Sequence, residues 1–163
     1  MRVAAISGTH LPRGTRRLPD PCVAHLRDAD LILHGGDLSS AAFLDELRAL
    51  GPPVRAVHGN ADEAALREAL PAQLVVTAGR ARIGLVHDAG PRAGREERLA
   101  ARFAGCNAVL YGHTHLPQVE LRGGLWILNP GSPTERRRGP FHSMLLLEIG
   151  ADGKIAPQLV RLT

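Results

Sequence analysis

The sequence predicts an α/β protein in which two β-sheets pack together with helices on the outside, formed by one domain over residues 1–163. In the first half, short apolar runs alternate with segments of helical spacing, which is typical of parallel strands joined by helices. In the second half, apolar runs follow one another around glycine-containing turns, as in antiparallel strands. No internal repeat, low-complexity tract or linker divides the chain, and its length is sufficient for one sizeable core.

The first half supplies three predicted strands and three predicted helices. The strands are Arg2–Ser7, Asp30–His34 and Val54–His58. The helices are Pro21–Arg27, Ala41–Leu50 and Asp62–Leu70. Ser39 or Ser40 is the expected N-cap of the second helix, because a hydroxyl accepts a hydrogen bond from the first turn. Gly51-Pro52-Pro53 ends that helix.

The second half is richer in strands. Three hairpins are predicted: Gln73–Ala78 with Ala81–His87, Gln118–Leu121 with Trp126–Asn129, and Ser143–Ile149 with Ile155–Arg161. Ala108–Tyr111 is a further buried strand. Pro91–Ala104 is predicted to form a helix with a charged outer face.

The composition is that of a globular protein, with 44% apolar and 22% charged residues. No apolar stretch is long enough to span a bilayer, so we expect no membrane partner. Residues 1–12 lack the apolar core and cleavage site of a signal peptide. Two cysteines, Cys22 and Cys106, do not make a disulfide framework. We therefore expect a cytoplasmic protein.

The charge balance does not by itself identify a partner. A net charge of +4 and a pI near 10.0 are compatible with nucleic-acid binding. The cations are nevertheless spread along the chain, with clusters only at Arg16-Arg17 and Arg136–Arg138, and Lys154 is the only lysine. Aromatic residues, at 3%, offer few surfaces for base stacking. Nucleic acid is therefore disfavoured, and a small phosphate-bearing substrate stays open.

Side chains that can bind a metal ion follow five of the predicted strands, at the point where each strand ends. They are His10, Asp37, Asn60, His87 and the pair His113 and His115. In α/β sheets, sites form beyond the carboxyl ends of the strands, and imidazole and carboxylate groups suit divalent metals. Each residue alone has an ordinary explanation, since Gly-Asp and Gly-Asn pairs are common turn formers. Their joint occurrence predicts a metal site.

This series of residues resembles the calcineurin-like metallophosphoesterases. The motifs, in chain order, are His10, Gly36-Asp37, Gly59-Asn60-x-Asp62, His87 and Gly112-His113-x-His115. More narrowly, the chain resembles their small bacterial and archaeal phosphodiesterase branch, which also contains the retromer scaffold subunit. The segment Asn129–Ser132 is similar to the closing loop of that branch. The resemblance implies a four-layer α/β/β/α sandwich of two mixed sheets flanked by helices, with two divalent ions. Manganese is the first choice, and iron, nickel or zinc are the alternatives.

The resemblance also implies which residues hold each ion. The first ion would take His10, Asp37 and His115, and the second would take Asp37, Asn60, His87 and His113, with Asp37 bridging. Asn60, His10 and His113 are the implied catalytic residues. Two ions about 4 Å apart activate water and hold phosphoryl oxygens, so the implied activity is hydrolysis of a small phosphodiester.

The chain departs from the family pattern at Gly8, where the family has an aspartate that binds the first ion. Losing it removes one ligand and one negative charge, so mutual repulsion between two ions is less compensated. We expect the first position to be weak or empty, and activity to be impaired. Asp88, beside His87, could supply a carboxylate, but adjacent side chains at a strand end usually diverge.

A second departure is Ala61, where larger members carry a histidine. Its absence favours diesters with good leaving groups. Asp62 is interpreted as orienting a ligand histidine or capping its helix. His34 and His58 are interpreted as structural residues or as supports of a metal ligand, rather than as ligands themselves. His25 and His142 are interpreted as ordinary polar residues with satisfied hydrogen bonds.

Two other functions remain open from the sequence. Gly8 favours a non-catalytic interaction module on the same fold, and a metal-dependent nuclease ranks third. Assembly of identical copies also stays open. Arginines near the proposed site could bind phosphate, although solvated surface charge explains each one equally well; they are Arg13, Arg16, Arg17 and Arg136–Arg138.

Overall fold

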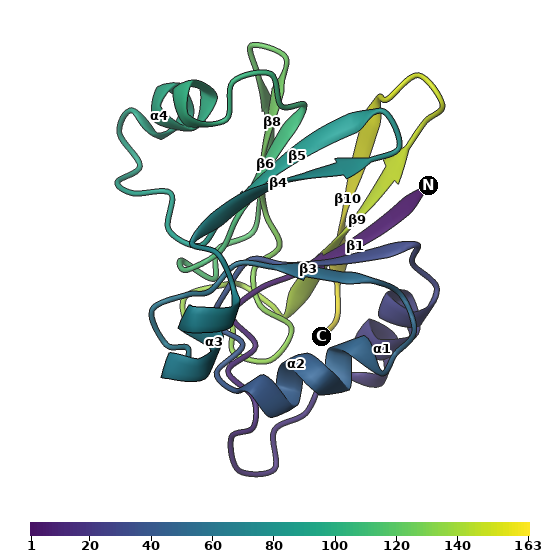
Figure 1. Ribbon diagram of the computed structural model, residues 1–163, viewed down its shortest axis with the longest axis vertical. Coiled ribbons are helices and arrows are strands. Elements are labelled where there is room, and N and C mark those ends of the chain that lie inside the picture. The colour runs from purple at the N-terminus through teal and green to yellow at the C-terminus, as the bar shows by residue number, and fades with distance from the viewer.

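The computed structural model describes residues 1–163 and contains two five-stranded mixed sheets that pack face to face (Figure 1). The first sheet has the order β10-β9-β1-β2-β3. Its strands are β1 (Arg2–Ile6), β2 (Leu31–His34), β3 (Val54–Ala56), β9 (Ser143–Ile149) and β10 (Ile155–Arg161). The second sheet has the order β4-β5-β6-β8-β7. Its strands are β4 (Gln73–Ala78), β5 (Ala81–Val86), β6 (Ala108–Tyr111), β7 (Gln118–Arg122) and β8 (Leu125–Asn129).

Four helices cover the outer faces of the two sheets, which confirms the predicted α/β/β/α sandwich. They are α1 (Asp20–Arg27), α2 (Ala41–Arg48), α3 (Ala64–Ala69) and α4 (Arg95–Arg102). Figure 1 shows α1, α2 and α3 on the side of the first sheet and α4 beside the second. None of the four combines the length and the apolar character needed to cross a bilayer.

The alternation of side chains along β1 explains why this strand is apolar throughout. Val3 and Ala5 join the core between the two sheets, whereas Ala4 and Ile6 join the core beneath α1 and α2. Successive residues of a strand point to opposite faces, and here both faces are covered. A third core lies between the second sheet and α4, where Leu99 and Phe103 pack against Val109 and neighbouring residues.

The strands that lead into the predicted site run in the same direction within each sheet. In the first sheet β1, β2 and β3 are parallel, with Ile6 opposite His34 at the end of the ladder. In the second sheet β5, β6 and β8 are parallel. Their carboxyl ends therefore meet at one edge of the sandwich.

Several predicted helix boundaries require correction. The helix predicted over Pro91–Ala104 begins only at Arg95, because Gly94 adopts a left-handed φ of 69° that a helix cannot include. The helix predicted from Asp62 begins at Ala64, after an extended Glu63. Ser40, rather than Ser39, caps α2: the backbone N–H of Phe43 donates to Ser40 Oγ at 3.1 Å.

Candidate metal centre

The loops after β1, β2, β5 and β6 bring five of the six predicted ligands into two groups that share Asp37. One group is His10, Asp37 and His115, and the other is Asp37, His87 and His113. Within each group the atoms that could bind a metal all lie within 4.8 Å of one another. The first sheet supplies His10 and Asp37, and the second sheet supplies the other three histidines.

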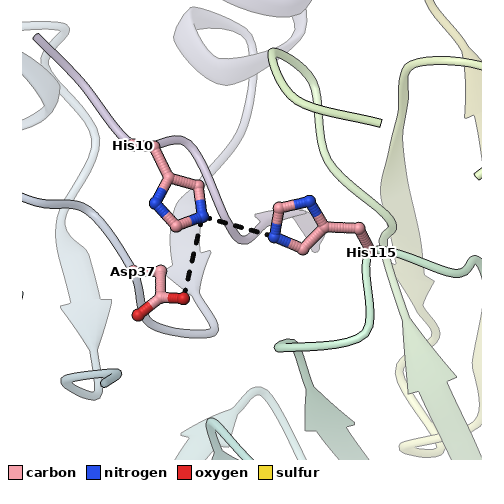
Figure 2. A group of neighbouring side chains, drawn as sticks. All are labelled: His10, Asp37 and His115. Carbon is pink, nitrogen blue, oxygen red and sulfur yellow. Dashed lines mark hydrogen bonds and ion pairs between the residues drawn. The ribbon is translucent and has the colours of Figure 1, made fainter. Parts of the chain in front are cut away.

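The first group is buried, and its side chains converge on His10 (Figure 2). His10 Nε2 lies 3.3 Å from His115 Nε2 and 3.7 Å from Asp37 Oδ2. His115 Nδ1 donates a hydrogen bond to the carbonyl oxygen of Glu135. The lone pair of His115 Nε2 is therefore directed into the group, because only the other ring nitrogen carries the proton.

The second group includes the sixth predicted ligand, Asn60, from the loop after β3. Asn60 Oδ1 lies 3.0 Å from His87 Nε2 and 3.0 Å from His113 Nδ1. His87 Nε2 is also 3.2 Å from Asp37 Oδ2, while His87 Nδ1 donates to the carbonyl oxygen of Gly35 at 2.8 Å. Oxygen and imidazole lone pairs thus converge at both groups, which is a donor set suited to divalent cations.

The protonation states of these residues also suit cations. Burial raises the pKa of Asp37, but the hydrogen bond and charge of His87 and the N–H of Ala61 outweigh it and bring that pKa to about 2. Burial lowers the pKa of His115 to about 4 and lowers that of His10. At neutral pH the first group therefore offers a charged carboxylate and neutral imidazoles, which metal binding requires.

His87 behaves differently from the other two histidines. Burial lowers its pKa, but the Asp37 carboxylate outweighs burial and leaves the pKa of His87 raised. A positive charge is thus favoured next to Asp37. A cation held between Asp37 and His87 would satisfy the same electrostatic demand.

The backbone at the predicted ligands is strained. His10, Asp37, His113 and His115 have φ values of 49°, 59°, 64° and 59°, in the left-handed region. This conformation costs a non-glycine residue on the order of 1 kcal/mol or more and persists only where the surroundings enforce it. Four such residues in one cluster indicate that their side-chain positions serve a function.

Asp62 holds the loop that carries Asp37, which corrects its predicted role as a helix cap or an orienter of a histidine. Asp62 Oδ2 accepts the N–H groups of Asp37 at 3.1 Å and Gly59 at 2.7 Å. Asp62 Oδ1 accepts the N–H of Ser39 at 2.7 Å. Gly59 is required beside this network, since a Cβ there would lie only 2.2 Å from Asp37 Oδ1.

The other polar residues at the strand ends have structural partners. His34 is buried, accepts the N–H of Gly36 at 3.1 Å and hydrogen-bonds Thr9 Oγ1 at 3.0 Å, as its structural interpretation predicted. Burial lowers the pKa of His34 to about 3. Asp88 is exposed and accepts the N–H of Gly90, so its carboxylate does not replace the missing aspartate.

A carboxylate that the sequence analysis missed lies next to the first group. Glu135 Oε2 is 3.5 Å from His10 Nε2, and the side chain is only 19% exposed. Arg13, Arg16 and Arg137 surround this carboxylate, so some of the arginines considered as phosphate ligands lie close to the site. The sequence signal that could have identified Glu135 is its position as a single acidic residue between the closing loop and Arg136–Arg138.

The closing loop supports the histidines of the second sheet. Asn129 Nδ2 donates to the carbonyl oxygen of Gly112 at 3.0 Å and to Thr114 Oγ1 at 3.2 Å. Ser132 Oγ donates to the carbonyl oxygen of Gly8 at 2.8 Å. The loop thus connects the turn that carries His113 and His115 to the turn that carries His10.

A cleft of about 380 Å³ opens beside the second group. Most of its lining residues are polar, and those that bear on function are Asn60, Arg67, His87, Arg102 and His113. Arg67 Nη2 donates to the carbonyl oxygen of Asn60, which fixes the loop at the mouth of the cleft. Arginine side chains here could contact an anionic ligand.

Comparisons with known proteins point to one family. The model of the calcineurin-like phosphoesterase superfamily domain matches residues 1–152. A probable metallophosphoesterase of Methanothermobacter thermautotrophicus is 34% identical over 164 residues, which cover 99% of this chain and 92% of the relative. Wild-type Vps29 of Entamoeba histolytica, in complex with Zn²⁺, superposes with a TM-score of 0.77 at 26% identity, with 100% of each chain covered. A Thermotoga maritima protein solved by NMR gives a TM-score of 0.76 at 28% identity, with 98% of each chain covered.

Proposed function

This chain belongs to the calcineurin-like phosphoesterase superfamily, and we propose that it is a phosphodiesterase that hydrolyses a small phosphodiester with the help of two divalent ions, Mn²⁺ foremost. The observation that carries the proposal is the position of Asp37. Its Oδ2 atom faces His10 at 3.7 Å on one side and His87 at 3.2 Å on the other. A single carboxylate can thus serve two ligand groups, which is the arrangement a two-metal site needs.

Six residues would hold the ions. The first position would use His10, Asp37 and His115, and the second would use Asp37, Asn60, His87 and His113. When bound, such a pair of ions lowers the pKa of water and polarises the phosphoryl oxygens. Gly8 leaves the first position with fewer ligands than in other family members, so it is the weaker of the two.

Asn60 and His113 lie where the phosphoryl group would enter. Asn60 turns Oδ1 towards His87 and His113, so its Nδ2 amide is left to donate to a phosphoryl oxygen. His113 is half-buried and lines the same cleft, whereas His10 is buried in the first ligand group. These three residues would orient the substrate and stabilise the negative charge that develops on it.

The cleft favours a small phosphodiester with a good leaving group. A volume of about 380 Å³ is within the range of small-molecule sites, and Arg67 and Arg102 offer charge-assisted hydrogen bonds to an anionic ligand. Ala61 provides no acid at the position where larger family members carry a histidine. The leaving group must therefore depart without a strong proton donor from this loop.

The test is hydrolysis of a bis-aryl phosphodiester by the metal-free chain, with and without added Mn²⁺. We expect turnover that depends on Mn²⁺ and is abolished by a chelator. Asn60→Ala should lower kcat by 10²-fold or more, as loss of a transition-state donor does. Asn107→Ala, at the opposite end of β6 from His113, should leave kcat unchanged. Absence of turnover in metal-replete protein, with diesters and with aryl monoesters, would contradict the proposal.

A non-catalytic interaction module is the second candidate, favoured by Gly8 and by the similarity to Vps29. Such a module needs a contiguous apolar surface for its partner. Few large apolar side chains are exposed; they are Met1, Val75, Leu116, Leu121 and Leu159. An interaction module does not need the convergence of metal-binding side chains on Asp37, so the enzyme is the better-supported candidate. Light scattering of the purified chain would show whether identical copies associate.

A further inference from the structure

The first ligand group has no space for the aspartate that Gly8 replaces. A Cβ added to Gly8 would lie 2.5 Å from His115 Nε2, so the imidazole of His115 occupies the volume of that side chain. Asp37 is the only carboxylate in this group. Two divalent ions sharing one carboxylate would be poorly neutralised.

Glu135 places a second carboxylate on the side of His10. Glu135 Oε2 lies 3.5 Å from His10 Nε2. This oxygen is buried and forms no hydrogen bond, although Arg16 Nη1 lies 3.6 Å and Arg137 Nη2 3.9 Å from it. The other oxygen, Oε1, accepts a hydrogen bond from Arg13 at 3.3 Å. Ion pairs with arginine at 3.6 Å and longer leave the buried Oε2 without a hydrogen bond, and such an atom in a folded protein often marks the place of an ion or an ordered water.

The backbone of Glu135 is already part of the site. Its carbonyl oxygen accepts the Nδ1 proton of His115, and its N–H donates to Ser132 Oγ at 2.9 Å. The hydroxyl of Ser132 in turn donates to the carbonyl oxygen of Gly8. One network thus ties Glu135 to the position of the missing aspartate and to a predicted ligand.

We propose that Glu135 supplies, through Oε2, the carboxylate that Gly8 lacks and completes the first position with His10, Asp37 and His115. The inference rests on the two-metal site proposed above. Glu135 is not among the side chains whose binding atoms all lie within 4.8 Å of one another, so its carboxylate must turn inwards to bind. The Arg13 contact opposes this rotation only weakly, because Arg13 is 65% exposed and exposed ion pairs contribute little. Arg16 is 28% exposed and lies 3.6 Å from Oε2, so it is the stronger restraint on the carboxylate.

The completed position would hold two carboxylates and two imidazoles. This set carries two negative charges and suits Mn²⁺, Fe²⁺ or Zn²⁺. The pair of ions would then share two carboxylates in place of one. Glu135 lies 127 residues beyond Gly8 in the chain. The lost ligand would therefore be replaced from the segment that follows the closing loop, after the last strand of the second sheet in the chain.

The competing account assigns Glu135 a structural role only. Its carboxylate oxygens lie 3.3, 3.6 and 3.9 Å from nitrogen atoms of Arg13, Arg16 and Arg137, and these ion pairs could simply hold two loops together. The two accounts predict opposite effects of removing an arginine. If Glu135 is a ligand, loss of Arg16 frees its carboxylate to bind metal. If Glu135 is only structural, loss of Arg16 removes an ion pair that holds the site together.

The experiment is calorimetric titration of Mn²⁺ into the metal-free full chain, followed by electron paramagnetic resonance of the loaded protein. We expect the wild type to bind two ions and to show the signal of a coupled Mn²⁺ pair. Glu135→Gln should lower the affinity for the more weakly bound ion by tenfold or more and change the affinity for the tightly bound ion by less than twofold. It should also replace the coupled signal by that of isolated Mn²⁺. Glu97→Gln, on the exposed surface of α4, is the matched control and should match the wild type. Arg16→Gln should leave both affinities unchanged or increased.

Each other outcome overturns the inference. If Glu135→Gln still binds two ions with wild-type affinity, Glu135 is not a ligand. If Arg16→Gln weakens the same ion as strongly as Glu135→Gln does, the ion pairs explain the effect. If the wild type binds one ion, the first position is not restored; if it binds none, the proposed function fails as well. Glu135→Ala gives a second test, and unfolding is not expected for either variant because the loop is held through the backbone of Glu135.

Discussion

The carboxylate of Asp62 holds the backbone of Asp37 in place, although the two residues lie on different loops. Asp62 Oδ2 accepts the N–H of Asp37 at 3.1 Å and that of Gly59 at 2.7 Å. Asp37 itself has a φ of 59°, a conformation that it would leave without such support. Asp62 is buried and belongs to neither ligand group, so it positions the proposed bridging ligand through a hydrogen bond to its backbone.

We therefore expect Asp62→Asn to weaken both metal positions, because Asp37 serves both. The variant exchanges a charged acceptor of three N–H groups for a neutral amide, and should lower the free energy of unfolding by about 2–3 kcal/mol. Urea unfolding of the metal-free protein and Mn²⁺ titration measure the two effects. Asp45→Asn, at an exposed ion pair on α2, is the control and should change the free energy of unfolding by less than about 0.5 kcal/mol. Weakening of only one position would contradict the expectation.

Gly8→Ala should destabilise the protein more than Gly14→Ala. The two glycines have nearly the same backbone conformation, with φ values of 59° and 57°. A Cβ on Gly14 meets nothing within 4 Å, whereas a Cβ on Gly8 meets His115 at 2.5 Å. Backbone strain alone costs about 1 kcal/mol, and the collision adds about 1–2 kcal/mol at position 8.

Urea unfolding of the two variants and of the wild type provides this comparison. Repeating the Gly8→Ala change in a His115→Ala background removes the collision, so the extra destabilisation at position 8 should disappear there. Equal destabilisation by Gly8→Ala in both backgrounds would show that His115 does not fill the volume. The same collision predicts that Gly8→Asp requires a shift of His115 before it can add a ligand.

His113→Gly should be more stable than His113→Ala when both are metal-free. Position 113 has a φ of 64°, which glycine adopts without cost and alanine does not. We expect a difference of about 1 kcal/mol in the free energy of unfolding, with metal binding at the second position lost in both variants. Thermal denaturation in a chelator measures the difference. If His113→Ala were the more stable variant, the backbone at this position would not be strained.

The metal-free protein should lose stability as the pH falls below about 6.5. Burial lowers the pKa of His34 from 6.5 to about 3 and that of His115 to about 4. Between these values and 6.5 the unfolded chain binds protons that the folded chain excludes, so each histidine removes about 1.4 kcal/mol per pH unit. The contribution is fully present above pH 6.5. Denaturant titrations at pH 7, 6 and 5 in a chelator should show this loss, with a shallower slope in His34→Gln; a flat profile would refute it.

Much of the fold follows from local sequence patterns. The strands β4, β6, β9 and β10 begin and end at the predicted residues, because glycine turns or polar residues bound their apolar runs. The helix α4 is shorter than predicted because charge spacing shows where a helix can continue but not that Gly94 adopts a φ of 69°. The proximity of the six candidate ligands could be predicted because they follow strands whose carboxyl ends share one edge.

Glu135 could not be predicted in this way. It follows no strand end directly, and its approach to His10 depends on how the closing loop folds back across the first turn. Asp62 was recognised as a supporting residue, but its partners are backbone N–H groups of three separate positions, which spacing along the chain does not reveal.

The predicted ligands divide between the two sheets, and this division has a mechanical consequence. His10, Asp37 and Asn60 come from the first sheet, and His87, His113 and His115 come from the second. A sliding motion of one sheet over the other would separate the ligand atoms. Ions bound by side chains from both sheets would therefore oppose that motion. Neither half of the chain could hold the pair alone. Binding of the proposed ions and folding of the whole sandwich would thus be coupled, each favouring the other.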